Sequence, residues 1–226
     1  MAFTLEQVVP WGRSFEEYAG MFSLSPKELG LNIISCGDGP ASFNYGMKER
    51  GHKVISCDPI YAFSAGQIRS RIKRTYASVM EQLKGNEEAY VWTTFKNPEE
   101  VGRVRMKAMN AFLEDYPHGK KEGRYLAECL PHISFNNDRF DLALCSHLLF
   151  LYSKHLSLDF HIASITEMLR VSKEVRIFPL LELSGGKSPY LKDVISEFRG
   201  KGHEVATPKV NYEFQRGGDM MLRISR

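Results

Sequence analysis

The chain has 226 residues, 43% of them hydrophobic, which is enough for one substantial α/β domain spanning 1–226. Its net charge of +3 is too small to indicate a polyanionic partner, and no apolar run reaches the roughly 20 residues of a membrane-spanning helix. The start of the chain lacks a signal-peptide layout, and no cysteine spacing suits a metal or a C-x-x-C pair, which predicts a cytoplasmic protein without disulfides or bound metal.

An amphipathic helix is predicted near the N-terminus, over Phe15–Leu24. Trp11, Phe15, Tyr18 and Phe22 recur there at helical spacing, so their rings share one face. We expect this face to pack on the rest of the domain.

The most informative segment is 31–61, which has the order strand, glycine turn, helix, strand and acid. An apolar run, Leu31–Ile34, ends in a turn that contains Gly37 and Gly39. Glycines allow the backbone to bend sharply and to approach a ligand closely, and Pro40 suits the first helical position. A second apolar run then ends at Asp58, where a carboxylate can accept hydrogen bonds from ribose hydroxyls. The layout predicts a nucleoside site at the carboxyl ends of parallel strands.

The glycine spacing distinguishes between two nucleoside cofactors. A dinucleotide fingerprint needs a third glycine three residues after the second, but Ser42 stands at that position. NAD is therefore disfavoured, and a ligand without a pyrophosphate fits the shorter turn better.

These motifs resemble motif I of the class I S-adenosylmethionine-dependent methyltransferases. The pattern is similar to an uncharacterised bacterial branch with C-x-G-G-P-x-S-F-N and then V-x-S-C-D-P-x-Y. The resemblance implies a doubly wound, Rossmann-like α/β sheet of seven strands with an antiparallel last strand. It also implies S-adenosylmethionine as cofactor, bound in this segment by Ser35, Cys36, Gly37, Gly39, Asp58 and Pro59.

One feature of the family is missing. The acid that the family carries near the end of the first strand falls at Ile33 here. Two interpretations of Asp38 stay open: it replaces the missing acid, or it is a solvated turn residue.

The resemblance also implies that the N-terminal segment covers the cofactor. Arg13 and Tyr18 are the candidates for this contact. The alternatives are core packing for Tyr18 and a solvated guanidinium for Arg13.

A helical insertion is expected after the second strand, over 62–120. One helix is predicted over Ser64–Lys84, and another begins at Asn97-Pro98, a capping residue followed by a proline at the first helical position. Insertions of this length are commonly lids, so we expect a cap over the substrate pocket. Basic residues on both helices favour a solvated surface over an anionic substrate or RNA: Arg69, Arg71, Lys73, Arg74, Arg103, Arg105 and Lys107.

The familiar strand order resumes after Gly123. Arg124–Glu128 is a short segment in which the resemblance implies that Leu126, Ala127 and Glu128 meet the adenine. Phe140–Cys145 is a nearly continuous apolar strand, as in buried parallel sheets.

Ser146 and His147 follow this strand at the predicted crevice. The resemblance places Ser146 at the cofactor, and His147 is the candidate catalytic base because an imidazole can accept a proton near neutral pH. Backbone hydrogen bonding is the alternative for His147, and Tyr152 and His155 are weaker candidates.

The C-terminal third is predicted to complete the sheet. Helices are expected over Asp159–Val171 and Pro189–Lys201, and strands over Val175–Leu181, Glu204–Val210 and Met220–Ile224. The resemblance implies that the last strand lies antiparallel between the fifth and sixth. Tyr212, Gln215 and Arg216 belong to the resembling segment and either line the site or form a turn.

The sequence therefore predicts a methyltransferase that uses S-adenosylmethionine and acts on a small-molecule acceptor, with no membrane and no nucleic-acid partner. An NAD-linked oxidoreductase and a non-catalytic S-adenosylmethionine-binding module are the alternatives. Positioning of the reactants supplies most of the catalysis that methyl transfer needs, so the chemistry requires no metal.

Overall fold

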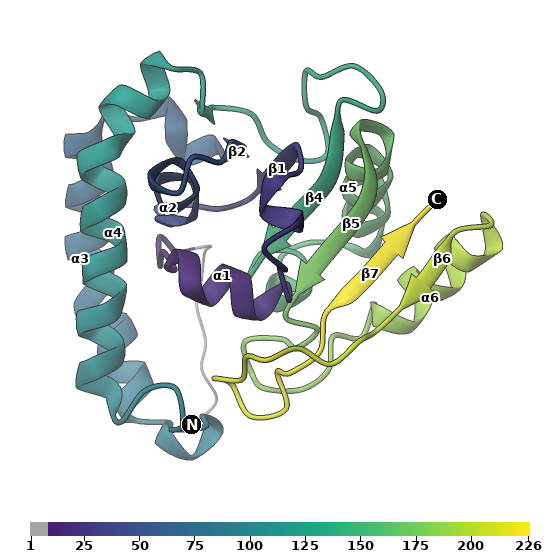
Figure 1. Cartoon of the computed structure of the whole chain (residues 1–226). Helices are drawn as coiled ribbons and strands as arrows, with labels where there is room; N and C mark the ends of the chain where they lie inside the picture. The colour runs from purple at the N-terminus through teal and green to yellow at the C-terminus, as the bar shows by residue number, and fades with distance from the viewer. Residues whose placement is uncertain (1–8) are drawn as a thin grey trace.

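The computed structural model describes residues 9–226, so the first eight residues of the expected domain lie outside it. One mixed sheet with the order β3-β2-β1-β4-β5-β7-β6 forms its centre (Figure 1). The strands pair in parallel except β7, which is antiparallel to both β5 and β6. This confirms the predicted seven-stranded Rossmann-like fold. The strands are β1 Ile33–Cys36, β2 Val54–Cys57, β3 Tyr125–Leu126, β4 Phe140–Ser146, β5 Ser172–Phe178, β6 Glu204–Ala206 and β7 Leu222–Ser225.

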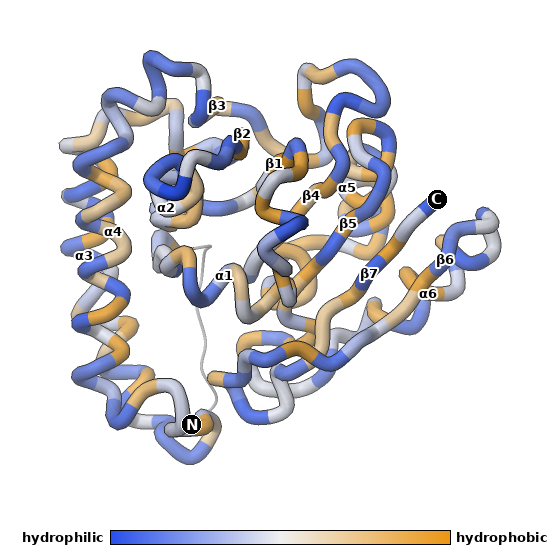
Figure 2. The backbone as a smooth tube through the Cα atoms, in the orientation of Figure 1, coloured by the Kyte–Doolittle hydropathy of each residue, from blue (hydrophilic) through white to orange (hydrophobic). Residues whose placement is uncertain are grey.

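Helices cover both faces of the sheet because side chains alternate along each strand. Ile33 contributes to the core under α1 and α2, whereas its neighbour Ile34 packs with α5 and α6. Figure 2 shows the hydrophobic residues of β1, β4 and β5 between these two layers. The helices are α1 Phe15–Met21, α2 Phe43–Glu49, α3 Ala65–Lys84, α4 Pro98–Lys121, α5 Leu158–Val171 and α6 Leu191–Gly200, with 3-10 turns η1 Glu28–Gly30, η2 Pro59–Ala62, η3 Glu87–Ala89 and η4 Phe150–Tyr152.

The two insertion helices, α3 and α4, form a long hairpin beside the β3 edge of the sheet (Figure 1). Ser64 and Gln67 make a capping box at the start of α3, and the Asn97 side chain accepts a hydrogen bond from Glu100 N at 2.9 Å at the start of α4. Near β3 the hairpin packs on Tyr61 and Tyr125. At its far end a second cluster joins α3 and α4 to the N-terminal segment and the C-terminal loop.

Three predicted details are wrong. Pro40 does not begin a helix, since α2 starts at Phe43 after Ser42, whose N–H donates to Arg13 O at 2.9 Å and lengthens the turn. The strand expected over Glu204–Val210 ends at Ala206, two residues before a proline that has no N–H to donate to a ladder. Arg105, expected on a solvated surface, is 1% exposed. None of the helices in residues 9–226 is long and apolar enough to cross a membrane.

Candidate functional site

The glycine turn follows β1 and is hydrogen-bonded to the carboxyl end of the neighbouring strand β2. Gly37 N–H donates to Cys57 O at 2.8 Å, and Gly39 N–H donates to the Asp58 carboxylate at 2.7 Å. Both glycines have positive φ, +76° and +54°, which favours glycine over other residues. A Cβ at Gly37 would lie 2.6 Å from the side chain of Leu148, whereas a Cβ at Gly39 would meet no atom within 4 Å. The side chain of Leu148 therefore fills the space beside Gly37, whereas the space beside Gly39 is open.

The carboxylate of Asp58 faces this turn. One oxygen accepts the Gly39 hydrogen bond, and the other accepts from Ile60 N at 2.8 Å, which caps η2. Burial, with a smaller contribution from the Asp38 charge, raises the pKa of Asp58 to about 6, although the hydrogen bonds from Ile60 and Gly39 and the charge of Arg71 act to lower it. Since a carboxylate oxygen has two lone pairs, each keeps one for a ligand hydroxyl.

Asp38 is buried beneath the turn, at 7% exposure, so its interpretation as a solvated residue is wrong. Its carboxylate accepts hydrogen bonds from Tyr18 Oη at 2.8 Å, from Ser56 Oγ at 2.6 Å and from Ser35 Oγ. These three hydroxyls compensate for the cost of burying the acid. Burial raises the pKa of Asp38.

Two buried hydrogen bonds lie between the glycine turn and the β4 loop. Tyr18 Oη donates to Asp38 at 2.8 Å, and Ser146 Oγ lies 2.8 Å from His147 Nδ1. His147 has a φ of +53°, and its N–H donates to Phe178 O at 2.6 Å. Burial and the charges of two nearby arginines lower the pKa of His147 well below its usual value, so the imidazole is neutral near pH 7. With Nδ1 occupied by Ser146, Nε2 is the ring nitrogen that remains for a substrate.

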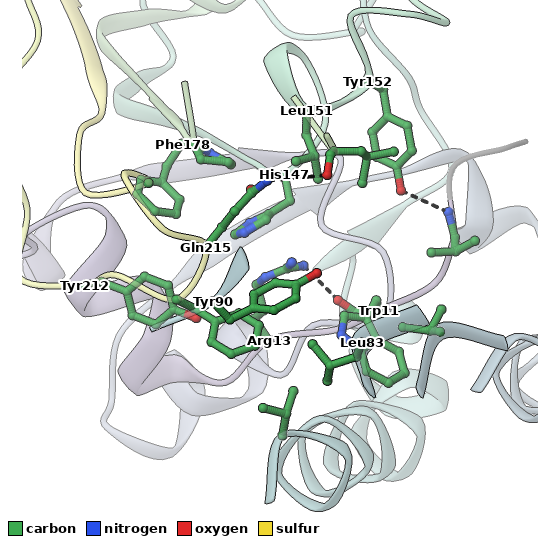
Figure 3. A pocket seen from close by; sticks show the side chains of 17 residues that line it. Trp11, Arg13, Leu83, Tyr90, His147, Leu151, Tyr152, Phe178, Tyr212 and Gln215 are labelled. Atoms are coloured by element: carbon green, nitrogen blue, oxygen red, sulfur yellow. Dashed lines mark hydrogen bonds between the residues drawn. The ribbon is translucent and has the colours of Figure 1, made fainter. Parts of the chain in front are cut away.

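His147 lines a cavity of about 110 Å³ at the carboxyl ends of β4 and β5. Its walls come from the N-terminal segment, from α3 and α4, from the loops after β4 and β5, and from the C-terminal loop. Figure 3 shows the Arg13 guanidinium and the His147 imidazole near its middle, among the rings of Tyr90, Phe178 and Tyr212. Gly39 and Asp58 are not part of its lining. The glycine turn and this cavity are thus two neighbouring sites, with the β4 loop between them.

Arg13 supplies the charge of the cavity. Its Nη1 donates to Trp11 O at 2.9 Å, but its buried Nε has no hydrogen-bond partner in the described chain. Burial and the positive charge of Arg105 lower the pKa of Arg13 to about 10, so it stays protonated at neutral pH. The alternative of a freely solvated guanidinium does not describe this side chain.

Behind the cavity lies a buried ion pair that was not predicted from the sequence. Arg105 of α4 donates to Glu17 of α1, and Tyr212 Oη donates to Glu17 at 2.8 Å. Arg105 stands four residues after Val101 and seven before Phe112, on the apolar stripe of its helix. A charge at such a position is the signal that could have predicted a buried pair.

The residues expected near the cofactor fall into two groups. The first group lies at the carboxyl ends of β2 and β3. There the Leu126 carbonyl accepts from Asp58 N at 3.2 Å, Ala127 and Pro59 are exposed, and Glu128 accepts from Ser134 N at 2.8 Å. The second group has buried side chains that leave little surface for a ligand: Tyr18, Ser35, Cys36 and Ser146.

The weaker candidates also divide. Tyr152, Tyr212 and Gln215 line the cavity. Arg216 is exposed and donates to Tyr90 O at 3.1 Å, which holds the C-terminal loop, and the exposed His155 is not among the lining residues.

Comparison with known proteins gives one clear relative. An uncharacterised protein of Methanocaldococcus jannaschii is 33% identical over 223 residues, 98% of each chain. This relative is archaeal, so the bacterial branch stays a prediction. No family model matches the chain.

Solved structures resemble the chain more distantly. Magnesium protoporphyrin IX methyltransferase of Synechocystis PCC 6803, with bound S-adenosylmethionine, is 13% identical with a TM-score of 0.45, over 88% of this chain and 72% of that one. The 1,6-didemethyltoxoflavin-N1-methyltransferase of Burkholderia thailandensis is 11% identical with a TM-score of 0.43, over 87% and 71%. At these scores the likeness assigns neither a substrate nor a cofactor to this chain.

Proposed function

Because the chain belongs to the family of the uncharacterised Methanocaldococcus jannaschii protein, whose name states no activity, we propose a function from the site itself. The protein is an S-adenosylmethionine-dependent methyltransferase of the cytoplasm that acts on a small-molecule acceptor. Gly39 and Asp58 bind the cofactor's ribose side, and the cavity beside His147 holds the acceptor.

The hydrogen bond from Gly39 N–H to Asp58 carries this proposal. It joins the open glycine of the first turn to the acid of the next strand at the carboxyl edge of the sheet, where ligands of doubly wound folds bind. The free lone pairs of Asp58 suit two vicinal hydroxyls, and the open space at Gly39 admits a ligand backbone. Leu126, Ala127, Glu128 and Pro59 border the same edge and would surround the base.

S-adenosylmethionine, when bound, supplies a methyl group that is already activated by the positive charge on its sulfur. The protein's own task is to position the acceptor, exclude water and take up a proton. His147 Nε2 accepts the proton that an acceptor hydroxyl or amine releases, and Ser146 holds the ring in place through Nδ1. The insertion at 62–120 acts as a cap, since Leu83 of α3 and Val101 of α4 form part of the cavity wall.

Calorimetry with S-adenosylhomocysteine tests the proposal. We expect the wild type to bind, Asp58→Ala to bind at least tenfold more weakly, and the exposed control Asp193→Ala to match the wild type, because lost hydrogen bonds to a charged group cost about 1.5–3 kcal/mol. Equal affinities for all three proteins would remove Asp58 from the site. If the wild type fails to bind, the proposed function is wrong.

Two further measurements separate the alternatives. Fluorescence transfer to NADH on mixing would favour an NAD-linked oxidoreductase. Binding of S-adenosylhomocysteine with no methyl transfer to any small molecule or RNA would favour a non-catalytic binding module.

A further inference from the structure

The cavity beside His147 carries one positive charge. Among the described residues that line it, Arg13 is the one with a charged side chain, since the pKa of His147 is lowered and its ring is neutral. Glu17, the nearest carboxylate in the wall behind, is paired with Arg105 and hydrogen-bonded by Tyr212. No carboxylate of residues 9–226 forms a salt bridge with Arg13. Within residues 9–226 the charge of Arg13 therefore has no carboxylate of its own, since Glu17, whose charge also acts on it, is paired with Arg105.

The guanidinium is also short of hydrogen-bond acceptors. Its Nε is buried and has no hydrogen-bond partner among residues 9–226, a state that costs free energy in a folded protein. A negatively charged ligand group beside the guanidinium would offset the repulsion between Arg13 and Arg105. A carboxylate matches the planar fork of a guanidinium with two parallel hydrogen bonds.

The size and walls of the cavity limit the rest of the ligand. At about 110 Å³ it is of the same order as an engineered cavity of roughly 150 Å³ that binds benzene, so its scale suits a ligand built on one ring. Aromatic side chains form part of the apolar wall, among them Trp11, Tyr90, Phe178 and Phe214, and flat rings pack well against such faces. A phosphate dianion would leave one negative charge uncompensated in these apolar surroundings.

We infer that the acceptor is a single-ring carboxylic acid whose carboxylate pairs with Arg13 and whose hydroxyl or amine faces His147. This inference rests on the proposed function for the methyl transfer, but binding of the acid can be measured without it. Arg13 would then select the acceptor by charge, while His147 takes up the proton of the group that is methylated.

Calorimetry with matched probes tests the inference. The acids are 4-hydroxybenzoate, 3-hydroxybenzoate and 2-aminobenzoate, and each has its amide as a neutral control of the same shape. We expect at least one acid to bind the wild type about tenfold or more tightly than its amide, because a hydrogen bond to a charged group is worth about 1.5–3 kcal/mol. Arg13→Gln should lose this preference, and Arg69→Gln, an exposed arginine of α3, should keep it.

Thermal unfolding first establishes that both variants are folded. S-adenosylhomocysteine is titrated in parallel against the wild type, so that cofactor binding and acid binding are measured separately. If the wild type does not bind S-adenosylhomocysteine, the proposed function is wrong. The comparison of acids with their amides still decides whether the cavity prefers a carboxylate. The inference is overturned if no acid binds at millimolar concentration, if amides bind as well as acids, or if Arg13→Gln retains the preference.

Discussion

Under the proposed function, the pKa of Asp58, which burial raises to about 6, makes cofactor binding depend on pH. The ribose hydroxyls would donate to the ionised carboxylate, so protonation of Asp58 would compete with the ligand. With a pKa of about 6, roughly a tenth of Asp58 is ionised at pH 5 and nearly all at pH 7.5. We therefore expect the affinity for S-adenosylhomocysteine to rise about tenfold between these pH values.

The raised pKa of Asp58 has the opposite effect on the unliganded protein: its free energy of unfolding falls as the pH rises. The folded pKa lies above the ordinary value of 3.8, so the folded state binds more protons than the unfolded state between them. The stabilisation is present at low pH and is lost as the pH rises through about 6, by roughly 3 kcal/mol at most. Urea unfolding with and without ligand measures both trends.

Calorimetry from pH 5 to 7.5 is the direct assay, with Asp58→Asn as the matched variant. Asp38 and Arg71 also influence this carboxyl group, so the variant is needed to assign the effect. Asp58→Asn should bind weakly at every pH and show no slope. A flat profile in the wild type, or a slope that persists in Asp58→Asn, would refute the reasoning.

Two further substitutions have predictable effects on stability. Arg105→Met leaves Glu17 buried without its cation and should lower the free energy of unfolding by about 3–5 kcal/mol, whereas the double variant with Glu17→Gln should recover most of the loss. Gly37→Ala combines a positive φ with a clash against Leu148 and should cost more than Gly39→Ala, which meets no atom and should cost about 1–2 kcal/mol of backbone strain.

Denaturant unfolding checks both predictions. A loss below about 1 kcal/mol in Arg105→Met, or no recovery in the double variant, would show that the ion pair is not the source of stability. Equal losses in the two glycine variants would show that the Leu148 contact is unimportant.

Much of the fold could be predicted because it depends on local patterns. The apolar runs of β1 and β4 and the caps at Ser64 and Asn97 each act within a few residues, so the sequence carries them directly. The order strand, glycine turn, helix, strand and acid likewise predicted that Gly39 and Asp58 lie at the same edge of the sheet. The error at Pro40 arose because the chain makes a longer turn before α2.

The cavity could not be predicted in this way. Arg13, His147 and Tyr212 come from segments far apart in the chain, and only the packing of α4 against α1 and the C-terminal loop brings them to one place. Burial of a charge or an acid depends on partners supplied by other elements, which is why the environments of Arg105 and Asp38 were not predicted. The sequence alone determined the strands, the glycine turn and the acid beside it, since these follow from short-range periodicity and turn chemistry, while the order of the strands in the sheet was implied by the resemblance. The tertiary structure decided the neutral histidine, the buried arginine and the shape of the cavity between them, since each depends on residues that are distant in the chain.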